Sequence, residues 1–384
     1  MQEKMALLLR DEISVHCYNF SMSTNSFLCA LLVAGSMSAY ADFAKYVEMT
    51  VNYTPTAAID GFPVLVRLNS SRIDYADVKN AGADLKFTDA TGETVYPHEV
   101  DTWNASGESL VWVRLPQLTN GAKFRMYYGD AAVTASPSPA SVWAGYDLVC
   151  HVSGTANDSA TPSRSGMLNP AGAAVAGVIG SAYGISGTDK GAAFMNQIYY
   201  TAESGGVELE DKEFSYSFWI RRTGAFVAWQ TLVGPRNGGN TDCWGIGSTA
   251  AADGATLYVW ANQSKKDSIP VPDGLVLNEW RKIDVVQNAT GVSMYVDGVL
   301  SGSKTMETPK RSWPQWTGWG GAVGNAQFGT TSQPSDFDEC RIFSTEASAA
   351  RIAADYATVK NANFLAYQAP RDNIGDPGSV LVFH

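Results

Sequence analysis

The sequence has few of the residues that most metal and nucleophile chemistry requires. Its 384 residues include four histidines and five cysteines. No histidine has the helical spacing of a metal-binding pair or lies near a nucleophile motif, and the cysteines form no zinc motif. No Asp-x-Asp-x-Asp-Gly calcium loop is present. Nothing in these patterns indicates an enzyme, so we expect a non-catalytic protein.

Charged residues are also scarce, at 17% of the chain, and no long helical period occurs. The net charge of −11 argues against binding to nucleic acid, which requires clustered lysine and arginine, and against anionic lipid surfaces. An acidic surface mainly favours solubility, so it identifies no partner. The 36 glycines, 11 tryptophans, 17 tyrosines and 15 phenylalanines suit a β-rich protein with many turns.

The N-terminal region carries a short apolar run at residues 26–35. The run is too short for a membrane span, which needs roughly 20 apolar residues. Ala39 and Ala41 then form a small-residue cleavage pattern. We predict that residues 1–41 are a signal peptide cleaved on export, rather than a buried helix or an uncleaved anchor. The mature chain would have no membrane span and would be periplasmic, on the cell surface or extracellular.

Residues 43–133 have the period-2 pattern of β-strands. Apolar residues alternate along one segment at Phe62, Val64, Val66 and Leu68, and further strands are predicted at 111–115 and 123–128. We therefore predict an all-β sandwich for this region.

Five segments of the same region occur in a characteristic order. They are FPVLV at 62–66, GADLKFTD at 82–89, PHEV at 97–100, VWV at 111–113 and YYGD at 127–130. This order resembles the domain of unknown function 2341 (DUF2341), which occurs in secreted and envelope proteins of bacteria. The resemblance implies no activity, but it implies that a laminin-G-like domain follows. A Pro/Ser linker at 134–141 would hold the two domains close together.

Residues 142–362 are predicted to form that second domain. Its motifs, in order, are FSYSFWI at 214–220, WRKIDVVQ at 280–287, MYVDG at 294–298 and DFDECRIF at 336–343, followed by an Ala-rich helix that begins near Ser348. The order resembles laminin-G-like, concanavalin A-type lectin domains. The resemblance implies a jelly roll of two antiparallel sheets that binds glycans or proteins more often than it cuts them. Residues 363–384 would be a tail with one added strand at 380–383.

Three cysteines remain after cleavage of the signal: Cys150, Cys243 and Cys340. Cys150 and Cys340 fall in the first and last strands of the second domain, which are often neighbours in this sandwich. A disulfide between them is geometrically conceivable, but we favour buried free thiols.

Two pairs of carboxylates could serve a glycanase, and we favour neither. Glu208 and Glu210 share one face, but their acidic segment precedes a strand and reads as a solvated turn. Asp338 and Glu339 are adjacent, so the alternation of a strand would point them to opposite faces.

A calcium site is one interpretation of two aspartates. Related sandwiches often hold a structural calcium ion near the rim, and Asp158 and Asp338 match the loop after the first strand and the start of the last strand. The alternative is that Asp158 forms an Asx-turn and Asp338 ends a sheet ladder.

A tryptophan-rich segment is the predicted ligand surface. Trp313, Trp316 and Trp319 recur at every third position, and Arg311 and Asn325 could supply polar contacts to sugar hydroxyls. Their Pro- and Gly-rich surroundings favour a loop, where binding residues commonly lie. Tryptophan is also a core residue, and a spacing of three is not a strand period, so packing is the competing interpretation.

Taken together, these features predict an exported bacterial protein that binds a glycan or a cell-surface protein through a lectin-like domain. A structural component of an envelope assembly is the first alternative, and a glycoside hydrolase or lyase is the second.

Overall fold

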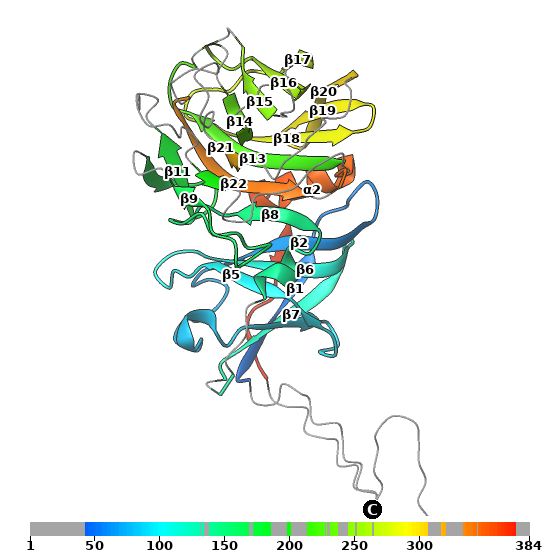
Figure 1. Cartoon of the computed structure of the whole chain (residues 1–384). Helices are drawn as coiled ribbons and strands as arrows, with labels where there is room; N and C mark the ends of the chain where they lie inside the picture. The colour runs from blue at the N-terminus through cyan, green and yellow to red at the C-terminus, as the bar shows by residue number, and fades with distance from the viewer. Residues whose placement is uncertain are drawn as a thin grey trace, which may run out of the picture.

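The computed structural model describes residues 43–130, 132–133, 138–168, 172–185, 198–200, 213–226, 228, 231–236, 245–249, 252–262, 265–305, 316–319, 333–343 and 345–373. They form two β-sandwiches whose four sheets are stacked in layers (Figure 1). The predicted fold class is confirmed: both domains are all-β, and the second is a concanavalin A-like jelly roll with one short C-terminal helix. No helix in these ranges is long and apolar enough to cross a membrane.

The first sandwich packs a six-stranded sheet, in the order β23-β1-β7-β3-β4 with β24 beside β1, on a three-stranded sheet, β2-β6-β5. Its strands before the linker are β1 Lys45–Val51, β2 Ile59–Leu68, β3 Lys86–Asp89, β4 Val95–Tyr96, β5 His98–Thr102, β6 Ser109–Leu118 and β7 Lys123–Tyr128. A 3-10 turn, η1 Asn80–Gly82, precedes β3. The predicted alternation holds in β2, because Val64 and Val66 enter the core of this sandwich while Leu65 faces the second sandwich.

The chain returns to the first sandwich after the second is complete. Strands β23 Leu365–Tyr367 and β24 Arg371–Asp372 pair antiparallel with β1. Residues predicted as a tail are therefore part of the first sheet, and the predicted strand at 380–383 lies outside the described residues. The second sandwich is thus an insertion between β7 and β23.

The second sandwich packs an eight-stranded sheet, β10-β11-β22-β13-β18-β19-β20 with β8 beside β22, on a seven-stranded sheet, β17-β16-β15-β14-β21-β12-β9. The strands of the first are β8 Tyr146–Cys150, β10 Ala173–Ala176, β11 Ser181–Ile185, β13 Phe214–Arg222, β18 Trp280–Asn288, β19 Gly291–Val296, β20 Val299–Thr305 and β22 Ser335–Phe343. Those of the second are β9 Met167–Leu168, β12 Ile198–Tyr200, β14 Thr231–Arg236, β15 Gly245–Ser248, β16 Thr256–Asn262, β17 Lys265–Pro270 and β21 Trp316–Trp319.

A β-bulge interrupts β22. The pairing register with β13 shifts between Ser217 and Trp219, and Glu339 has a φ of 49°. Phe337 and Cys340, three positions apart, consequently both enter the core, and Asp338 and Glu339 both lie on the outer side. The prediction that Asp338 and Glu339 point to opposite faces was wrong, because the extra residue of the bulge breaks the alternation.

Two short helices lie at the junction of the sandwiches: α1 Pro139–Val142 and α2 Ala349–Lys360. Ser348 caps α2 by accepting a hydrogen bond from the Arg351 N–H, as predicted. Each sandwich has its own hydrophobic core, and a third hydrophobic cluster joins the two sandwiches. Its buried residues are Leu65, Leu110, Trp112, Val142, Trp143, Val149, Ile179, Trp219 and Val359. The outer face of the eight-stranded sheet is therefore covered by the first sandwich and α2 (Figure 1).

Candidate functional site

Four ionisable side chains meet where the sandwiches join, and we call them the junction cluster: Glu99, Asp101, His151 and Glu339. His151 Nδ1 lies 2.8 Å from Glu339 Oε1, and its Nε2 lies 3.3 Å from Glu99 Oε2. Asp101, His151 and Glu339 also present ligand atoms within 4.8 Å of one another. Among the described residues, these three form a group of metal-ligating side chains that could hold one metal ion.

The strands explain why these residues meet. In β5, His98 points toward Phe87 in the first sandwich, so Glu99, at the next position, points toward the second sandwich. The pairing register of β5 shifts between Val100 and Thr102, and this irregularity places Asp101 on the same side, where it accepts a hydrogen bond from Ser153. His151 directly follows β8, and the bulge in β22 turns Glu339 outward toward it. The cluster therefore combines residues of both sandwiches.

The electrostatics favour a positively charged His151. Burial alone would lower the pKa of His151, but Glu339, Asp101 and Glu99 together raise it well above 6.5. Burial alone would raise the pKa values of Glu339 and Glu99, but the positive charge of His151 lowers both. Arg341 lowers the pKa of Glu339 further. At neutral pH the cluster therefore holds an imidazolium between ionised carboxylates.

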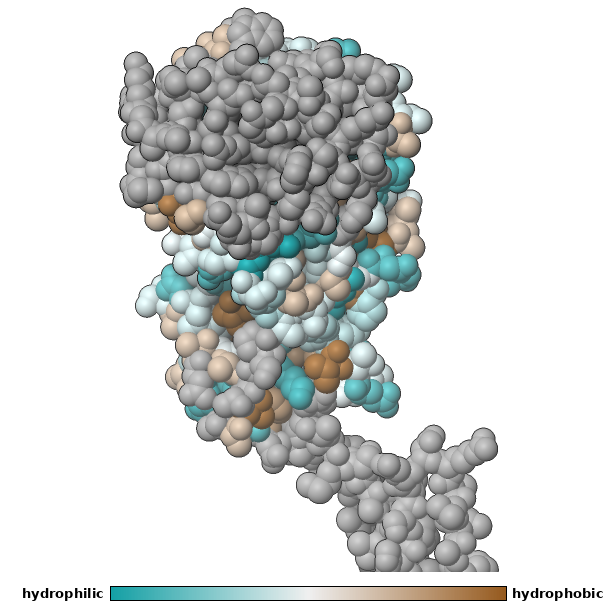
Figure 2. Space-filling view, viewed as in Figure 1, coloured by the Kyte–Doolittle hydropathy of each residue, from teal (hydrophilic) through white to brown (hydrophobic). Residues whose placement is uncertain are grey.

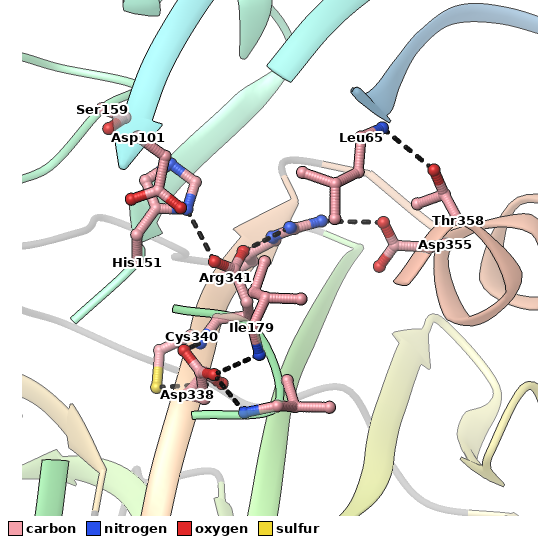
Figure 3. A network of polar contacts seen from close by, with 12 residues as sticks. Leu65, Asp101, His151, Ser159, Ile179, Asp338, Cys340, Arg341, Asp355 and Thr358 are labelled. Carbon is pink, nitrogen blue, oxygen red and sulfur yellow. Dashed lines mark hydrogen bonds and ion pairs between the residues drawn. The ribbon is translucent and has the colours of Figure 1, made fainter. Parts of the chain in front are cut away.

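A second set of buried charges continues from the cluster toward α2 (Figure 3). Arg341 donates to Glu339 and to Asp355 Oδ1, the latter at 2.7 Å, and Lys282 lies 3.0 Å from Asp355 Oδ2 and also pairs with Asp284. The Arg341 guanidinium also lies 4.6 Å from the ring centroids of Trp112 and Trp143. These contacts join strands of both sandwiches to the helix.

The space beside this network is too small for a sugar. A cavity of about 30 Å³ lies between α2 and the eight-stranded sheet, with Tyr216, Asp284, Arg341 and Asp355 among its lining residues. Such a volume suits one water molecule, whereas small-molecule sites typically measure ~300–1,000 Å³. The junction can hold charges, a proton or a small ion, but it does not admit a polysaccharide.

The structure places only part of the predicted tryptophan surface. Trp319 is fully buried in the core between the two sheets, so its ring cannot stack on a sugar, and packing is the correct interpretation for it. Trp316 begins β21. Arg311, Trp313 and Asn325 lie outside the described residues, as do Glu208 and Glu210.

Asp158 and Asp338, the predicted calcium ligands, each have their own hydrogen bonds. Asp158 Oδ1 accepts from the N–H groups of Val149 and Ala160, the second of which forms an Asx-turn, and its Oδ2 accepts from Arg164. Asp338 Oδ2 accepts from two N–H groups of the 178–179 loop, at 2.9 and 3.3 Å. Burial, and next the nearby Glu339 charge, raise the pKa of Asp338 well above its usual value. Calcium binding at these residues stays a prediction.

Cys150 and Cys340 are directly opposite each other on β8 and β22. The prediction that the first and last strands of the second domain are neighbours is therefore confirmed. Both are buried and neither is in a disulfide, which agrees with the buried thiols that the sequence favoured. Cys243 lies outside the described residues.

Reasoning from the sequence missed the junction cluster. No histidine has the spacing of a metal-binding pair in the sequence, and yet His151 is buried among three carboxylates. One signal was present: Glu99 and Asp101 are two acids at a strand period, beside the predicted strand 111–115. The sequence does not indicate that the side of the strand that carries these two acids packs against the other sandwich.

Several solved structures are similar to this chain. Domain 4 of AbnA, a GH43 extracellular arabinanase from Geobacillus stearothermophilus solved in complex with arabinotriose, is 14% identical over 55% of this chain and 98% of that one, with a TM-score of 0.44. The binding domain of Paraclostridial Mosquitocidal Protein 1 is 15% identical over 53% of this chain and 50% of that one, with a TM-score of 0.40.

The binding domain of Botulinum Neurotoxin DC, solved in complex with SialylT, is 15% identical over 57% of this chain and 52% of that one, also with a TM-score of 0.40. This chain therefore spans about half the length of the two toxin binding domains. No curated protein matches it.

Two family models match the sequence. Residues 81–159 match the domain of unknown function (DUF2341), a match that includes Glu99, Asp101 and His151. Residues 194–353 match the concanavalin A-like lectin/glucanases superfamily. The predicted order is confirmed: the chain joins a DUF2341 segment to a concanavalin A-like domain.

Proposed function

We propose that this is an exported, non-catalytic recognition protein whose concanavalin A-like sandwich binds carbohydrate. The family match of residues 194–353 carries the proposal, because that superfamily consists of lectins and glucanases. The buried position of the junction cluster supports binding over cleavage, since a glycanase needs its two carboxylates beside the substrate.

The packing of the two domains narrows the location of the ligand surface. The outer face of the eight-stranded sheet carries buried Lys282, Glu339 and Arg341 and is covered by the first sandwich and α2. The ligand would therefore bind the outer face of the seven-stranded sheet or the loops at its rim, including the tryptophan-rich segment that ends in β21. The first sandwich would act as a rigid base for this surface.

A glycan array probed with the full chain tests this proposal. Changing Trp313→Ala and Trp316→Ala together should weaken binding by about 2 kcal/mol or more, as expected when central aromatic residues are removed. Trp319 is left intact, because it belongs to the core. Trp280→Ala is the matched control, since Trp280 lies on the covered eight-stranded sheet.

The outcomes separate the candidate functions. Binding that is lost in the double variant and kept in the control supports the proposal. If the full chain binds no glycan but captures a defined envelope protein, a structural role in an envelope assembly replaces the proposed carbohydrate binding. Release of reducing ends from a polysaccharide would instead establish an enzyme.

A further inference from the structure

We propose that a divalent transition-metal ion such as Zn²⁺ binds at Asp101, His151 and Glu339 and joins the two sandwiches. The three residues come from β5, from the end of β8 and from the bulge in β22. Their ligand atoms lie within 4.8 Å of one another, and His151 and Glu339 are buried. One ion can therefore reach a residue of the first sandwich and two residues of the second.

The distances fit the coordination sphere of such an ion. With metal–ligand bonds of about 2.0–2.1 Å in the tetrahedral arrangement of Zn²⁺, the ligand atoms lie about 3.3–3.4 Å from one another. His151 Nδ1 and Glu339 Oε1 are 2.8 Å apart, so an ion between them would move the two atoms apart by about half an ångström. A carboxylate oxygen of Asp101 lies within 4.8 Å of both ligand atoms, so a small movement of this side chain would complete the site, and its Oδ1 accepts from Ser153 Oγ at 2.7 Å.

The charge balance also favours a cation at this position. Glu99, Asp101 and Glu339 surround His151, so three carboxylates face one imidazole. The nearest second cation, Arg341, divides its hydrogen bonds between Glu339 and Asp355. Binding of the ion at His151 Nδ1 would release the proton that this nitrogen shares with Glu339, and it would place a divalent charge among the three carboxylates.

The carboxylates are already held in place by neighbouring donors. Ser153 donates to Asp101, and Arg341 donates to the Glu339 oxygen that faces away from His151. Ser159 Oγ and Trp143 Nε1 each donate to Glu99 at 2.5 Å. Such outer hydrogen bonds orient metal ligands in advance and raise metal affinity.

The donor set selects the class of ion. One imidazole nitrogen with carboxylate oxygens suits Zn²⁺ and similar ions, whereas Ca²⁺ takes six to eight oxygens. The site is distinct from the predicted calcium ligands Asp158 and Asp338. It also does not depend on the proposed carbohydrate binding, and its test involves no glycan.

The test uses the full chain, stripped with a chelator, incubated with Zn²⁺ and desalted. Elemental analysis should find one Zn²⁺ per chain, and tenfold excesses of Ca²⁺ or Mg²⁺ should not displace it. Asp101→Asn keeps the size of the side chain and an acceptor for Ser153, but it should weaken Zn²⁺ binding by about tenfold or more. Asp267→Asn, which changes an exposed acid on β17, should leave binding unchanged.

X-ray absorption at the zinc edge gives a second measurement that needs no variant. It should show nitrogen and oxygen ligands that include one imidazole and no sulfur. Less than about one Zn²⁺ per two chains at saturation, a sulfur ligand, or full affinity in a correctly folded Asp101→Asn variant would each overturn the proposal.

Discussion

Arg341 illustrates how single residues stabilise the junction. Its guanidinium lies 4.6 Å from the ring centroids of both Trp112 and Trp143 and pairs with Glu339 and Asp355, and only 2% of the residue is exposed. Burying a charge is costly unless it is paired and hydrogen-bonded, so each member of this network depends on the others.

Replacing Arg341 by methionine should therefore lower the free energy of unfolding by about 3–5 kcal/mol, because the buried carboxylates Glu339 and Asp355 each lose one of their two cationic partners. Urea denaturation measures the change. Lys123→Met is the matched control, since Lys123 pairs with Glu48 at 2.9 Å but its side chain is 53% exposed. The control should cost less than about 1 kcal/mol. Equal losses in the two variants would contradict the role given to Arg341.

His98 should make the fold sensitive to acid. Burial, with a smaller contribution from the Lys86 charge, lowers the pKa of His98 to about 4 from 6.5. Between these values the unfolded chain binds a proton that the folded chain does not, so stability falls as the pH drops from 6.5 toward 4, by at most about 3 kcal/mol.

His98→Gln should flatten this part of the stability curve, measured by urea denaturation at several pH values. At pH 7.5 both proteins hold a neutral side chain and provide the reference. An unchanged slope in the variant would show that His98 does not cause the acid sensitivity.

At the scale of elements, α2 connects the two sandwiches. Ala350 and Ala354 enter the core of the first sandwich, while Asp355 pairs with Lys282 and Arg341 of the second. Thr358 adds a direct bond to the first sandwich, because its Oγ1 accepts from the Leu65 N–H at 3.0 Å (Figure 3). The helix is therefore held by contacts on both sides.

Thr358→Val should cost about 1–3 kcal/mol, since it leaves the buried Leu65 N–H without its acceptor while keeping the side-chain volume. Thr358→Ser keeps the hydroxyl and should cost less. Thermal unfolding compares the two variants. A serine variant less stable than the valine variant would mean that the methyl group, and not the hydrogen bond, is the important contact.

Some elements were predictable because their signals are local. The Asp297-Gly298 turn between β19 and β20 has φ values of 52° and 82°, which this dipeptide adopts readily, and Ser348 caps α2 as expected. The orientation of Glu339 was not predictable, because a bulge leaves no clear mark in the sequence. The inward direction of Trp319 and the meeting of Glu99 with His151 depend on long-range packing, which one sequence does not contain.

At the scale of the molecule, the two sandwiches share an interface of apolar and charged groups. Nine buried residues form its apolar cluster, and the junction cluster and Arg341 add buried charges. On the described part of the face in Figure 2, apolar residues form small separate spots among polar ones. The hydrophobic clusters of the described residues lie in the two cores and at the junction.

We expect the full chain to unfold in one calorimetric transition, with equal calorimetric and van't Hoff enthalpies. The reason is that the second sandwich is inserted into the first, so that β23 and β24 pair with β1 at a lower entropic cost when the chain between them is folded. Two separate transitions would show that the junction does not couple the domains.

The pairing of β24 with β1 also decides how the molecule responds to tension. Lys45 and Asp372 are cross-strand partners, so the chain enters and leaves the folded body at the same point. A pull on both ends would unzip β24 and β23 from β1 one residue pair at a time, and the inserted sandwich would bear no load.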